Sequence, residues 1–102
     1  MSAEPSAPEG LSESGARLWA SALERFPFRP TELALLESAL RALDRAEKAR
    51  AVVECEGLTV ETPSSGVVRP HPACSIEAEA RREFRIAWRT LGLVDSNGPE
   101  GD

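Results

Sequence analysis

The sequence has few of the residues from which metal centres are built. Among its 102 residues there are two cysteines, Cys55 and Cys74, and one histidine, His71. The cysteines lie 19 residues apart, a spacing that matches neither a zinc motif nor a redox pair, so we expect two free thiols. One histidine, two distant cysteines and scattered carboxylates do not make a metal site. We therefore expect no metal ion and no cofactor.

Catalytic and membrane signals are missing as well. The chain has no phosphate-binding glycine loop, no Ser-His-Asp arrangement and no paired-carboxylate motif. No apolar run approaches the roughly 20 residues that span a bilayer, and residues 1–10 lack the apolar core of a signal peptide. These absences predict a protein that is not an enzyme, has no membrane partner and works in the cytoplasm.

The net charge of −5 arises at the two ends of the chain. Residues 1–10 and 93–102 hold five acidic residues, which leaves 12 of the 17 acidic residues against all 12 basic residues in between. A chain of this length forms one small domain with a modest core, so association with copies of itself would stabilise it. We expect a disordered arm over residues 1–10, a helical domain over 11–94 and an acidic tail over 95–102.

The longest predicted element is a helix over residues 30–56. It is rich in strong helix formers, Pro30 suits its first position, and Gly57 suits the left-handed residue that ends a helix. Leucines at spacings of three and four indicate one apolar face, and a second row of smaller residues widens it on one flank. The leucines are Leu33, Leu36, Leu40 and Leu43, and the smaller residues are Ala39, Ala46 and Val53.

The second half of this helix is less clearly amphipathic, because Glu47, Arg50 and Glu54 fall on the side of the leucines. Either the helix continues into solvent beyond its own core, or this half packs on a partly polar surface such as a neighbouring copy. The spacing of charges on the outer face predicts two surface ion pairs, Glu37 with Arg41 and Asp44 with Lys48.

A first helix is predicted from Ser12 or Ser14, either of which can cap it, to about Phe26. We interpret Trp19 on its apolar face as a core anchor. The following segment, residues 26–30, is so short that the first two helices must be neighbours. This segment contains two prolines, whereas a DNA-reading helix-turn-helix has a glycine-centred turn. The second helix also begins with acidic rather than basic residues. Both features disfavour a helix-turn-helix.

A β-hairpin is predicted between the second and third helices. Residues 58–62 and 67–69 are rich in β-forming residues, and residues 63–66 have the composition of a turn. Because two strands alone are marginally stable in water, we expect the hairpin to lie on the helices or to pair with another subunit. The predicted fold class is therefore mainly α, a three-helix domain with a short hairpin, expected to assemble as a ring.

The third helix is predicted over residues 72–91. We expect His71 to cap or orient its start and Pro72 to occupy its first turn. One side of this helix is apolar, with Ala73, Ile76, Ala80, Phe84, Ala87, Trp88 and Leu91. The candidate residues for the core or an oligomer interface are Trp19, Leu36, Leu40, Leu43, Phe84 and Trp88.

Four arginines lie opposite that apolar side, within a sector of roughly 100° at about 100° per residue: Arg81, Arg82, Arg85 and Arg89. This arginine stripe fits a solvated face balanced by nearby glutamates, a contact with DNA phosphates, or a contact with an acidic face of a neighbouring subunit. Phosphate contacts position a protein without reading bases, so DNA binding here would be nonspecific. Arg69 on the hairpin is a further candidate DNA contact.

The order and spacing of these pieces resemble the small subunit of phage terminases. The resemblance covers residues 15–93 and is closest to the branch in which a ribbon leads to a His-Pro-Ala tripeptide. The matching pieces are Leu18-Trp19, the run from Leu35-Leu36 to Asp44, His71-Pro72-Ala73 and Leu91-Gly92-Leu93.

The resemblance implies a non-catalytic DNA-packaging factor of the host-cell cytoplasm. Such subunits form homo-oligomeric rings, engage double-stranded viral DNA and regulate the large subunit, which carries the ATPase and the nuclease. Residues 1–14 leave no room for the separate helix-turn-helix domain of many members, so we expect weak or nonspecific DNA binding. Two alternatives stay open: a small DNA-binding regulator or antitoxin-like protein, which would be a discrete dimer, and a protein–protein adaptor whose arginines pair with acidic helices.

Overall fold

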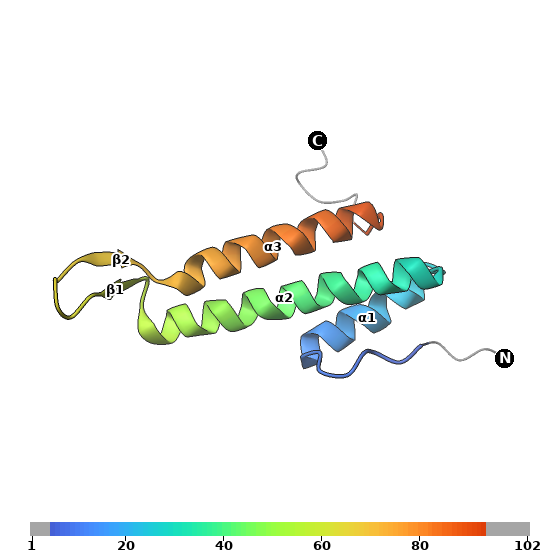
Figure 1. Cartoon of the computed structure of the whole chain (residues 1–102). Helices are drawn as coiled ribbons and strands as arrows, with labels where there is room; N and C mark the ends of the chain where they lie inside the picture. The colour runs from blue at the N-terminus through green and yellow to red at the C-terminus, as the bar shows by residue number, and fades with distance from the viewer. Residues whose placement is uncertain (1–4, 94–102) are drawn as a thin grey trace.

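Three helices and one hairpin follow one another in the computed structural model, which describes residues 5–93 (Figure 1). This arrangement confirms the predicted mainly α fold of three helices with a short hairpin between the second and the third, whereas the ring stays a prediction. The predicted acidic tail, residues 95–102, lies outside the described residues. The elements in chain order are α1 (Glu13–Arg25), α2 (Pro30–Glu56), β1 (Thr59–Glu61), β2 (Val68–Pro70) and α3 (Pro72–Thr90).

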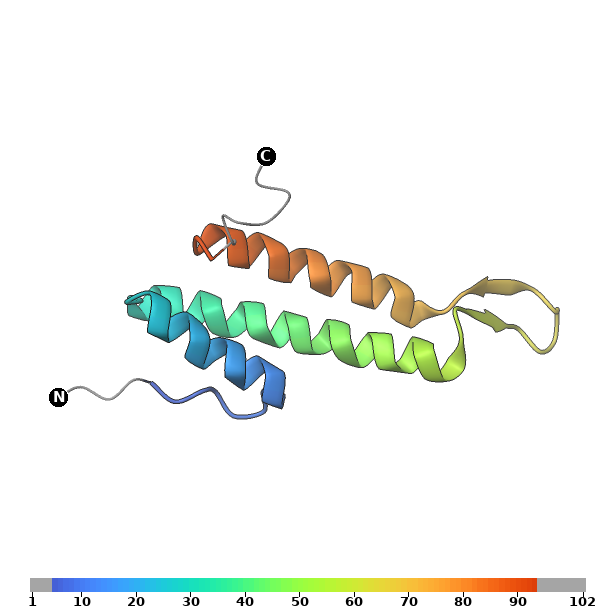
Figure 2. The same cartoon turned by 180° about the vertical axis from the view of Figure 1, so that it is seen from behind.

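The long helix α2 is the central element of the fold. The helix α3 runs back along it in the opposite direction, and α1 covers only its N-terminal half (Figures 1 and 2). The molecule measures 63 × 36 × 20 Å, and its radius of gyration of 17.1 Å exceeds the roughly 13 Å of a compact domain of this length. The distal half of α2 therefore has a helix on one side only.

The main apolar core lies where all three helices meet. Trp19 and Ala22 of α1 pack there against Leu36 and Leu40 of α2 and against Leu93, which follows α3. Of the candidate core residues, Trp19, Leu36 and Leu40 are buried, whereas Leu43, Phe84 and Trp88 are partly buried. The rings of Phe84 and Trp88 lie 5.0 Å apart and extend this core along α3.

From Ala39 to Val53, α2 packs on α3 through small side chains, which let two helices approach closely. We call this contact the alanine seam; it consists of Ala39, Ala42, Ala46, Ala49 and Val53 on α2 and Ala73, Ala80 and Ala87 on α3, all buried. The buried side of α2 thus shifts from the leucines to the small residues, and Glu47, Arg50 and Glu54 remain exposed. Ile76 was predicted on the buried side of α3, but 51% of its surface is exposed.

The hairpin extends past the ends of α2 and α3, and none of the three described helices covers either of its faces (Figure 1). Its strands are antiparallel, with Val60 opposite Arg69 and Glu61 opposite Val68. The N–H of His71 donates to the carbonyl of Leu58 at 2.8 Å and closes its base. Gly57, with φ of +94°, ends α2 in a backbone conformation that favours glycine.

Candidate nucleic-acid interface and assembly surfaces

The arginine stripe is divided in two by the structure. Arg82, Arg85 and Arg89 are exposed on the side of α3 that faces away from α2. None of these three takes part in an ion pair within residues 5–93. Three guanidinium groups on one exposed helix face can bind phosphate groups by charge and by paired hydrogen bonds.

Arg81 differs from the other three, because it is held within the protein. Its Nε donates to Glu77 Oε2 at 2.8 Å, and the same glutamate lies 4.0 Å from Nη1 of Arg50 on α2. The Glu77 side chain is only 17% exposed, so this small network joins the two helices at the edge of the alanine seam. Arg81 is thus already partnered, and we expect it to contribute less to any contact with DNA.

Arg69 is exposed on β2 and does not join the stripe. It lies before the first residue of α3, whereas Arg82, Arg85 and Arg89 lie in the second half of that helix. At 1.5 Å per residue, about 15 Å of helix separates Pro72 from Arg82. The structure therefore offers two separate basic positions.

His71 and Pro72 form the start of α3. The Nδ1 atom of His71 accepts a hydrogen bond from the N–H of Ala73 at 3.0 Å, which makes His71 the N-cap residue. Because Nδ1 accepts, the ring hydrogen of the neutral imidazole is on Nε2, which lies 2.7 Å from Glu56 Oε1 at the end of α2. One buried side chain thus fixes both ends of the hairpin to the helices.

A carboxylate that the sequence placed on the surface is buried instead. Asp44 is 7% exposed and accepts hydrogen bonds from the N–H and the hydroxyl of Ser12, both at 2.7 Å. The predicted surface pair of Asp44 with Lys48 is therefore wrong, whereas the pair of Glu37 with Arg41 is confirmed at 2.8 Å. The sequence did contain a signal for this burial: Asp44 follows Leu40 by four residues and therefore lies on the leucine side of α2.

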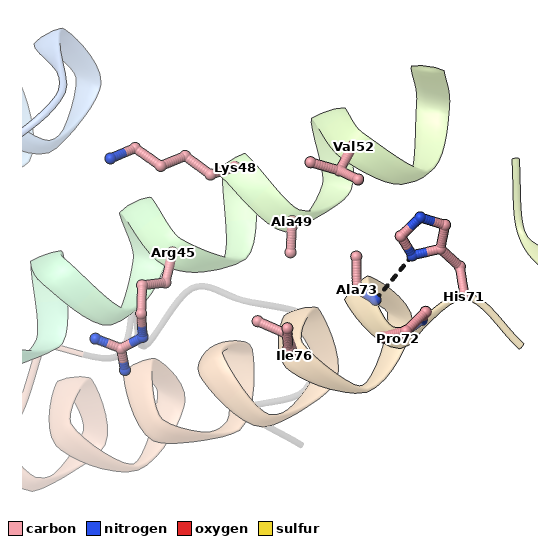
Figure 3. A pocket seen from close by; sticks show the side chains of 8 residues that line it. All are labelled: Arg45, Lys48, Ala49, Val52, His71, Pro72, Ala73 and Ile76. Carbon is pink, nitrogen blue, oxygen red and sulfur yellow. Dashed lines mark hydrogen bonds between the residues drawn. The ribbon is translucent and has the colours of Figure 1, made fainter. Parts of the chain in front are cut away.

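Sequence reasoning also missed a shallow apolar groove between α2 and α3, next to the hairpin (Figure 3). Its volume is about 380 Å³. Val52 and Ile76 stand on its sides and Ala49 and Ala73 form its floor, while Arg45 and Lys48 lie at the edge on α2. Its remaining lining residues are His71 and Pro72. This groove lies outside the core in which the three helices meet, so it is a candidate contact surface.

Residues 5–93 contain no group of three or more His, Cys, Asp or Glu side chains arranged to hold a metal ion. Cys55 is exposed and Cys74 half-buried, and neither forms a disulfide. Within the same part of the chain, every helix is too short or too polar to cross a bilayer.

The sequence matches the profile of the family described as phage terminase, small subunit, over residues 16–97. The match includes α1 from residue 16 onward, all of α2 and α3, the hairpin, the arginine stripe and the groove. The chain belongs to the phage terminase small-subunit family. Comparisons with curated proteins and with solved structures gave no significant match.

Membership of the terminase small-subunit family places the chain in phage DNA packaging. Members of this family are generally non-catalytic and are associated with a large subunit and with DNA. The arginine stripe, the hairpin and the groove are therefore the candidate surfaces for contacts with DNA, with the large subunit and between copies.

Proposed function

We propose that this terminase small subunit assembles as a homo-oligomeric ring, engages double-stranded viral DNA when packaging starts, and regulates the large ATPase and nuclease subunit. The observation that carries the proposal is the exposed set Arg82, Arg85 and Arg89, which forms no ion pair within the described residues, in a chain of this family. In a ring this face repeats in every copy, so weak contacts with phosphates act together.

The DNA contact is proposed to be nonspecific. The three arginines lie along a helix face and can reach phosphate groups, but phosphates carry no direct sequence information. Binding by charge releases counterions, so the affinity falls steeply with salt concentration. A gel shift with two unrelated duplexes of equal length should then give equal affinities at every salt concentration.

The test of this surface is the double variant Arg82→Glu/Arg85→Glu. A matched control is Arg17→Glu/Arg25→Glu, which changes the net charge equally but on exposed residues of α1. We expect the first variant to lose DNA retention and to keep the oligomeric mass, and the control to keep both. Loss of the oligomer in the first variant would instead make the stripe a subunit interface, as the adaptor alternative requires.

Oligomeric mass separates the proposal from its alternatives. Light scattering at micromolar concentration should give a single species of many times the chain mass of 11.0 kDa. A dimer would favour the regulator or antitoxin-like alternative. Adding the wild-type protein to purified large subunit should change its ATPase rate, and an unchanged rate would contradict the proposed regulation.

A further inference from the structure

We propose that the hairpin of one copy docks in the apolar groove of a second copy of this chain, so that successive copies bind head to tail. The inference rests on the proposed ring and names the contact that would build it. Its two halves are the hairpin (residues 58–70) and the groove between α2 and α3.

Exposed apolar residues are concentrated on these two surfaces. Within residues 5–93 six large apolar side chains are exposed, and five of them lie on the hairpin or beside the groove. Leu58, Val67 and Val68 are 66%, 53% and 61% exposed on the hairpin, and Val52 and Ile76 flank the groove (Figure 3). Apolar surfaces gathered in this way mark contact sites more often than single exposed residues do.

The hairpin cannot reach the groove of its own chain. Pro70 and Pro72 restrict the backbone at its base, and the hydrogen bond from the N–H of His71 to Leu58 holds the two strand ends together. The hairpin consequently points away from the helices, along their common direction (Figures 1 and 2). A free-standing pair of strands is only marginally stable in water, and the groove of a second copy offers an apolar surface that can cover it.

Charge favours the hairpin over other occupants of the groove. Lys48 at the groove edge and Glu61 on β1 are both exposed, and neither takes part in an ion pair within residues 5–93. If the grooves of two copies faced each other, Lys48 of one copy would lie close to Lys48 of the other, and the two positive charges would repel. The hairpin instead brings Glu61 to Lys48 together with the apolar side chain of Val68, which lies opposite Glu61 in the register.

A contact between two different surfaces leaves one hairpin and one groove free at the ends of every pair. Repeated addition of copies then either closes a ring or extends a filament, depending on the rotation between neighbours. Hairpin-to-groove docking is therefore the kind of contact from which a ring can be built, and no further surface of the chain is required.

The first test removes each half of the contact separately. Ile76→Lys places a charge in the groove and Val68→Lys places one on the hairpin; both positions are more than half exposed, so the fold is expected to persist. Ile86→Lys is the matched control, because Ile86 is a 55% exposed isoleucine of the same helix outside the groove. Circular dichroism verifies the fold of all three variants.

We expect each of Ile76→Lys and Val68→Lys to raise the concentration of half-assembly by at least about tenfold, which corresponds to about 1.4 kcal/mol. Ile86→Lys should assemble as the wild type does. An equimolar mixture of the two defective variants should give a species of twice the chain mass of 11.0 kDa and nothing larger, because only one intact hairpin and one intact groove remain per pair.

Three outcomes would overturn the inference in distinguishable ways. If the wild type is a ring and both variants assemble normally, the hairpin–groove contact is wrong and the proposed function survives. If only Ile76→Lys prevents assembly, the groove has another occupant. If the wild type itself has the mass of one chain, both the contact and the proposed ring are wrong.

A charge exchange tests the orientation of the docked hairpin. Lys48→Glu and Glu61→Lys should each weaken assembly, because each places two like charges at the contact. The two changes combined in one chain should restore assembly, because the carboxylate is then on the groove edge and the ammonium group on the hairpin. Failure of the double variant to assemble better than either single variant would overturn the proposed pairing of Lys48 with Glu61.

Discussion

Asp44, in the middle of α2, accepts two hydrogen bonds of 2.7 Å from Ser12, the N-cap residue of α1. The Ser12 hydroxyl in turn accepts from the N–H of Gly15 at 3.0 Å, as an N-cap does. The carboxylate therefore sits at the positive end of the α1 dipole and is buried there. Gly15 leaves the space for it, because a Cβ at that position would lie 3.1 Å from Asp44 Oδ1.

We predict that Asp44→Ala lowers the free energy of unfolding by about 1–3 kcal/mol, since it removes two hydrogen bonds between Ser12 and a charged carboxylate. Glu47→Ala is the control, because Glu47 is exposed on the same helix; its effect should stay within about 0.5 kcal/mol. Urea denaturation measures both. Equal midpoints for the two variants would mean that the contact between Asp44 and Ser12 does not stabilise α1.

The cap of α3 gives a second prediction. His71→Ala removes the acceptor for the N–H of Ala73 and should lower the free energy of unfolding by about 0.5–2 kcal/mol. His71→Asn supplies a strong N-cap acceptor but loses the contact with Glu56, so its effect should be smaller. If the two variants are equally destabilised in thermal denaturation, the contact with Glu56 rather than the cap is what stabilises this end.

The alanine seam predicts that added volume between α2 and α3 is unfavourable. Ala80 is 3% exposed, and Ala80→Leu should destabilise the protein by about 1–3 kcal/mol because the two helices must move apart. Ala78→Leu adds the same atoms on the exposed side of α3 and should be nearly neutral. A stable Ala80→Leu variant with unchanged circular dichroism would show that the seam has unfilled space.

The division of the arginine stripe predicts unequal salt dependence. If Arg89 contacts one phosphate, Arg89→Ala should reduce the slope of log affinity against log salt concentration by about 0.9 per engaged copy. Arg81→Ala should reduce it less, because Arg81 already pairs with Glu77. Fluorescence anisotropy with a labelled duplex at several salt concentrations measures the slopes. Equal reductions would mean that Arg81 leaves Glu77 when DNA binds.

The elements themselves could be predicted closely from the sequence, because local signals agree with the tertiary structure. Pro30 and Gly57 mark both ends of α2, and Pro72 marks the start of α3. The predicted end of α1 at about Phe26 lies one residue beyond its last helical residue, Arg25. Such agreement is expected where propensity and capping residues favour the same boundaries.

The environment of single side chains could not be predicted equally well. The position of Asp44 on the leucine side of α2 indicates burial, but only the position of Ser12 in space shows that the carboxylate binds the start of another helix. Ile76 fits the apolar side of α3 by spacing, yet it stands at the side of the groove next to the small residue Ala49 of α2, and 51% of its surface is exposed. Both depend on which helix packs where, and spacing along one helix does not specify this.

Within residues 5–93, two clusters of buried apolar residues lie at opposite ends of α2. One joins Trp19, Leu36 and Leu40, and the other joins Ala49, Val53 and Ala73. Because the second cluster is small, its amides should exchange with solvent through local opening well before the first cluster unfolds. If a second copy docks as proposed, the hairpin end can adjust its shape to that copy while the three-helix end stays folded. Conformational adaptation and thermodynamic stability then belong to different ends of one helix.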